Sequence, residues 1–129
     1  MRYLLDVNVL LAAAWASHPH YAAADAWLKG KSVAVCPLAE LGFLRISTHR
    51  KAIAAPMEDA RKALETFLSE TQATRIADDL PALESHAENS EEVTDQYLVA
   101  LAERHGCKLA TLDGGIRHRA VELIEPAEA

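Results

Sequence analysis

Short apolar runs alternate with segments of helical periodicity along the whole chain. The apolar runs predict strands at residues 3–5, 32–36, 74–77, 108–112 and 120–124. The intervening segments predict helices up to residue 16, over 19–29, from 37, from 56 and over 95–105, with a weak helix at 81–87. Thr94 is the expected N-cap of the 95–105 helix, and Gly106 is its expected stop. Strands that alternate with helices favour an α/β fold with a parallel sheet covered on both faces.

The 129 residues suffice for one domain, 1–129, with no linker or repeat. Thirteen Lys+Arg against 19 Asp+Glu give a formal net charge of -6, which argues against a protein that coats nucleic acid by bulk charge. Cys36 and Cys107 fall in apolar segments, where we expect free, buried thiols rather than a disulfide framework; a reducing cytoplasm is the expected compartment. No apolar run is long enough to span a membrane, so no membrane contact is expected.

Four acidic residues fall where the predicted topology would gather them. Asp6 follows the first strand, Glu40 opens the helix after the second, and Asp113 follows the strand at 108–112. Asp95 begins a helix that runs antiparallel to that strand and therefore starts at the same edge. Ligands of open parallel sheets bind at the carboxyl ends of the strands. The sequence therefore predicts that the four carboxylates converge.

Such a convergence needs a counter-ion. Two like charges about 4 Å apart repel by roughly 4 kcal/mol at an effective dielectric near 20. All-oxygen sites suit Mg²⁺ or Mn²⁺, and a metal-bound water can hydrolyse a phosphodiester. Taken singly, however, each acid could be a turn former or a helix cap. Spacing alone leaves a functional site and a set of structural acids equally open.

Four segments together resemble PIN domains, and specifically the VapC-type toxins of toxin–antitoxin pairs. The segments are 4–12 (LLDVNVLLA), 40–45 (ELGFLR), 93–98 (VTDQYL) and 109–113 (LATLD). They occur in the family's order and span nearly the whole chain. Each is weak alone, but the set is specific.

The resemblance implies a three-layer α/β/α sandwich around a mainly parallel sheet of four to five strands. It implies a Mg²⁺- or Mn²⁺-dependent endoribonuclease in which Asp6, Glu40, Asp95 and Asp113 hold the metal and are catalytic. The implied substrate is RNA, with tRNA or rRNA as the usual targets. The implied partners are a VapB-type antitoxin and a second copy of the chain in a homodimer.

Three further residues are supporting candidates. Asn8 could orient Asp6 or a metal-bound water, and it could equally be a helix N-cap. Thr111 points to the same sheet edge as Asp113 if the strand alternates, so its hydroxyl could support the acidic site. Arg45 lies beyond Glu40 on the same predicted helix and could contact RNA phosphate or a carboxylate. A surface arginine and an ordinary strand threonine are the alternative interpretations.

Two basic groups could help to hold RNA despite the net negative charge. One contains Arg45, His49, Arg50 and Lys51, and the other contains Arg117, His118 and Arg119. Each group could instead be a solvated surface. His18 and His20 have no third ligand at zinc spacing, so we expect them to be surface or loop residues.

Two other functions compete with the nuclease hypothesis. A haloacid-dehalogenase-type phosphohydrolase also has an Asp after its first strand, but Asn8 stands where that class has a second Asp. An inactive PIN-like binding module would keep the fold without the chemistry, although all four acids are present.

Overall fold

The computed structural model describes residues 1–125, so the last four residues of the expected domain, 126–129, lie outside the described residues. Its centre is a five-stranded sheet in which every strand pair is parallel. The strands are β1 (Arg2–Leu5), β2 (Ser32–Val35), β3 (Thr74–Arg75), β4 (Cys107–Thr111) and β5 (Val121–Leu123), in the order β3-β2-β1-β4-β5. The predicted α/β fold is confirmed, and the sheet is wholly rather than mainly parallel.

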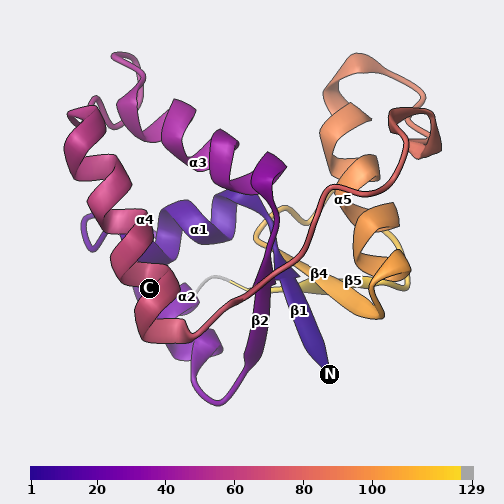
Figure 1. The fold of residues 1–129 in the computed structure, drawn as a ribbon, viewed down its shortest axis with the longest axis horizontal. Helices are drawn as coiled ribbons and strands as arrows, with labels where there is room; N and C mark the ends of the chain where they lie inside the picture. The colour runs from indigo at the N-terminus through magenta and orange to yellow at the C-terminus, as the bar shows by residue number, and fades with distance from the viewer. Residues whose placement is uncertain (126–129) are drawn as a thin grey trace.

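Helices cover both faces of this sheet. They are α1 (Val7–Ala14), α2 (Tyr21–Leu28), α3 (Pro37–Thr48), α4 (Met57–Thr71) and α5 (Val93–Arg104). In Figure 1, α5 lies on one side of the strands and α1 to α4 gather on the other. No helix among residues 1–125 has both the length and the apolar character needed to cross a membrane.

The core lies between the central strands and the helices on either side. Leu4 and Leu5 of β1 and Leu109 and Ala110 of β4 are completely buried. Strands covered on both faces have near-continuous apolar sequences because neither side of the strand meets water. Burial on both faces also leaves the strand ends as the place where polar side chains of β1 and β4 can reach solvent.

The structure differs from the helix predictions at the start of α5 and at residues 81–87, and it shortens α1 and α2 by one or two residues at their ends. The turn Ser90–Glu92 leads directly into α5, so the helix begins at Val93 and Thr94 lies inside it rather than capping it. The weak helix predicted at 81–87 is a single 3-10 turn, Ala82–Glu84. The expected stop at Gly106 is confirmed: its φ of +68° is a left-handed conformation that favours glycine. Cys36 and Cys107 are free and buried, as expected.

Helices α1 and α3 approach each other closely at Gly42. A Cβ atom built on Gly42 would lie 2.8 Å from the Val7 Cγ2 atom, inside the normal contact distance. Val7 follows Asp6, and Gly42 lies half a turn beyond Glu40 on α3. This contact therefore sets how the helices that carry two of the candidate acids lie against each other.

Candidate active site

Asp6 is held by two hydrogen bonds at the carboxyl end of β1. Its side chain is the N-cap of α1, where Oδ1 accepts from the Val7 backbone N–H at 2.7 Å. Oδ2 accepts from the Thr111 hydroxyl at 2.8 Å. The residue is 5% exposed. Asp6 therefore presents a buried carboxylate in one fixed orientation.

Thr111 connects the ends of β1 and β4. While its Oγ1 atom donates to Asp6, it accepts from Asn8 Nδ2 at 3.1 Å and from the Asp113 backbone N–H at 3.1 Å. Asn8 Oδ1 also accepts from the Leu112 backbone N–H at 3.1 Å. Asn8 thus ties the start of α1 to the end of β4, and Asp6, not Asn8, is the N-cap. The supporting positions predicted for Asn8 and Thr111 both adjoin Asp6.

Asp113 and Asp95 lie together beyond the end of β4. Asp113 Oδ1 accepts from the Gly115 backbone N–H at 2.8 Å, which closes the turn after the strand. Asp95 projects from the first turn of α5. Both line a pocket of about 180 Å³ together with Glu91, Glu92, Gln96, Gly115 and Ile116.

The charges of Asp6, Asp95 and Asp113 act on one another. Burial, followed by the charges of Asp6, Asp113 and Glu92, raises the pKa of Asp95 to about 6. The pKa of Asp6 is also raised, mainly by burial and to a smaller extent by Asp113, although the Thr111 and Val7 hydrogen bonds oppose the shift. None of the ion pairs found within residues 1–125 involves these three carboxylates. They form a negatively charged site that favours a cation.

Glu40 lies at the same sheet edge, but its nearest charged neighbours are different. Its Oε2 atom is 3.9 Å from Arg75 Nη2, and the charge of Asp78 also acts on it, with an effect opposite to that of Arg75. The pKa of Glu40 lies above its ordinary value, mainly because of burial. The charge of Arg75 lowers it and the charge of Asp78 raises it further. In the described part of the chain, no three His, Cys, Asp or Glu side chains are already placed to hold one ion. The structure thus couples Asp6, Asp95 and Asp113, whereas Glu40 stands beside Arg75.

A comparison with protein families matches the PIN domain over residues 3–122. The chain belongs to the PIN domain family. Ribonuclease VapC38 of Mycobacterium tuberculosis is 37% identical over 88% of this chain and 86% of its own length. Ribonuclease VapC39 of the same species is 35% identical over 93% of this chain and 94% of its own length. These relatives place the chain among the VapC-type PIN domains.

One solved structure supports the fold. It is the crystal structure of VapBC2 from Rickettsia felis bound to a DNA fragment from its promoter. The matched chain is 18% identical, with a TM-score of 0.58 over 88% of each chain. At this identity the match concerns the fold alone, and it agrees with the α/β architecture of the PIN domain.

The sequence patterns missed two acidic residues of this PIN domain. Asp78 acts on Glu40 and accepts a hydrogen bond from the Leu38 backbone N–H at 2.9 Å. Glu92 acts on Asp95 from the preceding turn. Asp78 carried a usable signal, because it directly follows the strand predicted at 74–77, as Asp6 directly follows β1. Glu92 carried none, since it belonged to a polar segment with three glutamates.

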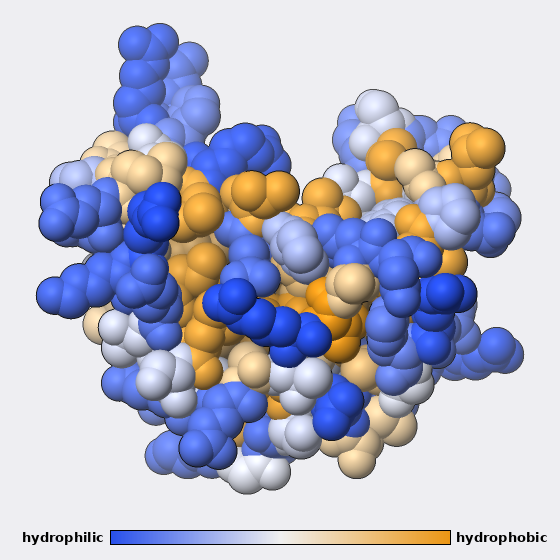
Figure 2. Space-filling view, viewed as in Figure 1, coloured by the Kyte–Doolittle hydropathy of each residue, from blue (hydrophilic) through white to orange (hydrophobic). Residues whose placement is uncertain are grey.

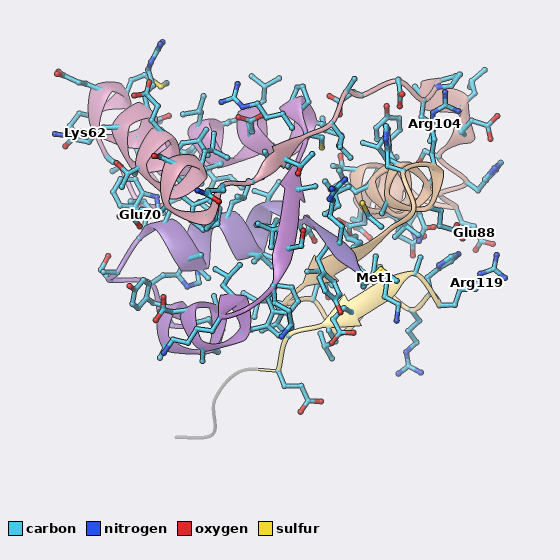
Figure 3. All side chains as sticks on the ribbon, turned by 60° about the horizontal axis from the view of Figure 1, so that its bottom comes forward. Met1, Lys62, Glu70, Glu88, Arg104 and Arg119 are labelled. Carbon is cyan, nitrogen blue, oxygen red and sulfur yellow. The ribbon has the colours of Figure 1, made fainter. Side chains whose placement is uncertain are left out.

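Two members of the second basic group, His118 and Arg119, pair with a glutamate away from the acidic site of the PIN domain. Glu103 Oε1 is 3.6 Å from His118 Nε2, and Glu103 Oε2 is 3.4 Å from Arg119 Nη2. Glu103 is eight residues beyond Asp95 on α5, a separation of about 12 Å along a helix. The chain must return to the other edge of the sheet before the parallel strand β5, and Figure 3 shows Arg119 extending outward there.

The remaining basic candidates are surface residues. Arg45 lies in the last turn of α3 and is exposed, and Arg50 and Lys51 follow the helix on the surface. His18 and His20 lie between α1 and α2, as expected for loop residues, with ring centroids 5.7 Å apart. The pKa of His18 is lowered by partial burial and by the charge of His20.

Proposed function

We propose that this PIN domain is a metal-dependent endoribonuclease that acts as the toxin of a toxin–antitoxin pair. The observation that carries the proposal is the coupled set of Asp6, Asp95 and Asp113, in which burial and then the neighbouring negative charges raise the pKa of Asp95 to about 6. Three carboxylates from distant parts of the chain are costly to hold together without a cation. The naming of relatives as ribonucleases supports the same activity.

The donor set fits Mg²⁺ or Mn²⁺, since it consists of carboxylate oxygens. Asp6, Asp95 and Asp113 would hold the ion, and Glu40 would join them directly or through water. When bound, the ion supplies a water of lowered pKa and offsets charge on the phosphate.

The chain's own contribution is orientation. Two donors hold the carboxylate of Asp6, and the Thr111 hydroxyl links it to the backbone of Asp113. Because these bonds exist before any ligand arrives, little reorganisation is needed when a cation and a phosphate enter. Cleavage by water attack in line would leave a 5′-phosphate and a 3′-hydroxyl.

The names of the relatives support a toxin–antitoxin setting for this proposal. A VapB-type antitoxin is the proposed inhibitor, because the matched structure is described as a VapBC2 complex. A tRNA or an rRNA is the proposed substrate, the cytoplasm the proposed compartment, and a homodimer the proposed assembly. The proposal for Arg45 is contact with substrate phosphate at the exposed end of α3.

The test is RNA cleavage by the purified full chain with Mg²⁺, with Mn²⁺ and with EDTA. We expect metal-dependent cuts with 5′-phosphate ends, and no cuts from Asp95→Asn or Asp6→Asn. Asp25→Asn is the matched control, because Asp25 is an exposed aspartate on α2 outside the acidic site. Intact RNA with every metal would contradict the proposal. Binding of an antitoxin without cleavage would favour the inactive module, and phosphate release from small phosphoesters alone would favour the phosphohydrolase.

A further inference from the structure

We propose that a hydrophobic pocket between the first turns of α3 and α5 binds one unpaired base of the RNA substrate. This inference rests on the proposed ribonuclease function. The pocket, here called the base pocket, has a volume of about 310 Å³. Its apolar lining is Leu38, Leu80, Ala82, Val93 and Tyr97, and Asp78, Ser85 and Thr94 complete it.

The base pocket lies next to the acidic residues, because the first turns of the same two helices carry both. Leu38 lies two residues before Glu40 in the first turn of α3, and Val93 lies two residues before Asp95 in the first turn of α5. Figure 2 shows hydrophobic surface on both sides of the hollow between α3 and the segment that precedes α5. A nucleotide whose phosphate lies at the carboxylates therefore has its base, or that of its neighbour, within reach of the pocket.

The lining matches the chemistry of a nucleobase. Unpaired RNA bases are recognised by stacking on aromatic side chains and by hydrogen bonds to their edges. Tyr97 supplies the aromatic ring, and Leu38, Leu80 and Val93 supply aliphatic surface. A flat apolar ligand with a polar edge fits such a lining better than a charged or sugar-like ligand does.

Charge favours a base over a phosphate in this pocket. Asp78 is the only carboxyl-bearing residue of the lining, and its Oδ2 atom is held in place by the hydrogen bond from the Leu38 N–H. A carboxylate repels phosphate but accepts from the exocyclic amino group of adenine, cytosine or guanine. We therefore expect preference for an amino-bearing base over uracil.

The walls of the base pocket are held before a ligand enters. The Tyr97 hydroxyl donates to the Leu80 carbonyl at 2.8 Å, and the Ser85 hydroxyl donates to the Val93 carbonyl at 2.7 Å. These bonds join the segment after β3 to α5 and fix the tyrosine ring. A preformed site loses less entropy when its ligand binds.

The test is a double-mutant-type cycle, in which a substitution in the protein is combined with removal of one base from the RNA. The probe is a single-stranded RNA that the wild-type chain cuts, remade with an abasic nucleotide at each position near the cut. We expect kcat/KM of the wild type to fall roughly 5- to 100-fold at one abasic position. On intact RNA, kcat/KM of Tyr97→Leu should fall by a similar factor. On the RNA that is abasic at that position, kcat/KM of Tyr97→Leu should not fall further, because the effects of two groups in contact are not additive.

Controls separate the base pocket from general damage. Tyr21→Leu, on α2, should behave as wild type on every probe. Ala82→Trp fills the pocket from its exposed rim without touching the core, so it keeps the test valid if Tyr97→Leu does not fold. Tyr97→Phe keeps the ring and should retain the abasic effect.

The outcomes distinguish two failures. If the wild type cuts no RNA with either metal, the proposed function itself fails. If it cuts RNA but Tyr97→Leu and Ala82→Trp show the wild-type abasic profile, the base pocket proposal is overturned while the ribonuclease stands. It is also overturned if these variants cut RNA normally and lose only antitoxin binding, because the pocket then docks a protein.

Discussion

At Asp95, burial and neighbouring charge both oppose ionisation, so this carboxylate destabilises the metal-free protein at neutral pH. Its folded pKa of about 6 lies above its ordinary value of 3.8. Above pH 6 the folded state must hold an unfavourable charge, and that cost is lost as pH falls through 6 towards 3.8. The folded protein therefore gains stability relative to a variant without this charge as the solution is acidified.

Asp95→Asn should consequently stabilise the metal-free protein at pH 7. The difference between pKa 3.8 and about 6 corresponds to about 3 kcal/mol, but the side chain is only partly buried and solvent screens its charge, so we expect about 1 kcal/mol. Urea unfolding in EDTA at several pH values measures this difference, which should disappear near pH 4. Asp25→Asn, outside the acidic site, should show no such pH-dependent gain. A loss of stability for Asp95→Asn at pH 7 would refute the electrostatic account.

Thr111 stabilises the folded protein, because its hydroxyl is fully buried and makes three hydrogen bonds. Thr111→Val leaves Asn8 and Asp6 without that partner, and we expect a loss of about 1–3 kcal/mol in the free energy of unfolding. Thr111→Ser keeps the hydroxyl and should lose less. Ser47→Ala is the matched control: it removes a buried hydroxyl that accepts from Trp15 at 2.9 Å, far from the acids.

Cleavage assays separate the two buried hydroxyls. Both Thr111→Val and Ser47→Ala should reduce stability, but only Thr111→Val should also reduce kcat, by roughly 10- to 100-fold. Equal kcat values for the two variants would show that Thr111 stabilises the fold without orienting the carboxylates.

At the scale of elements, the contact of α1 with α3 sets where Glu40 lies relative to Asp6. Gly42→Ala places a methyl group 2.8 Å from Val7 Cγ2, and β-branched valine has little freedom to move. The clash should outweigh the better helix propensity of alanine and cost about 1–3 kcal/mol. Thermal unfolding of Gly42→Ala, Val7→Ala and the double variant measures the coupling. The double variant should recover stability relative to the sum of the single changes; strict additivity would contradict the predicted clash.

The sequence predicted the element types but not all of their ends or neighbours. Apolar runs such as that of β4 identify strands because a parallel strand is buried on both faces. The predicted start of α5 was wrong because the 3-10 turn Ser90–Glu92 runs directly into the helix. The helix therefore begins at Val93 and needs no side-chain cap from Thr94. The packing of the loop decides whether a 3-10 turn continues into a helix, and local sequence propensity carries no information about that packing.

The same limit applies to the site. The rule that polar residues at the carboxyl ends of parallel strands share one edge predicted that Asp6, Asp95 and Asp113 lie near one another, and in the structure the charges of Asp6 and Asp113 act on Asp95. It did not reveal that Glu40 stands beside Arg75, because this contact joins α3 to an edge strand of only two residues. Nor did it place Arg119 beside Glu103, which depends on the return of the chain to begin a parallel β5.

At the scale of the whole molecule, the acidic site should couple metal binding to folding. The three carboxylates repel one another in the metal-free fold, whereas the unfolded chain separates them, so a cation that binds only the folded state stabilises it. At about 100 times the dissociation constant, this stabilisation is about 2.7 kcal/mol. We expect Mg²⁺ and Mn²⁺ to raise Tm by several degrees at pH 7, with a smaller increase near pH 5, where the raised pKa of Asp95 keeps it protonated. Differential scanning calorimetry of wild type, Asp95→Asn and Ser47→Ala tests this, since Ser47→Ala should keep the full response and Asp95→Asn should lose most of it. A wild-type Tm that neither ion changes would mean that the carboxylates hold no metal in the absence of RNA, and the ion would then have to enter with the substrate phosphate.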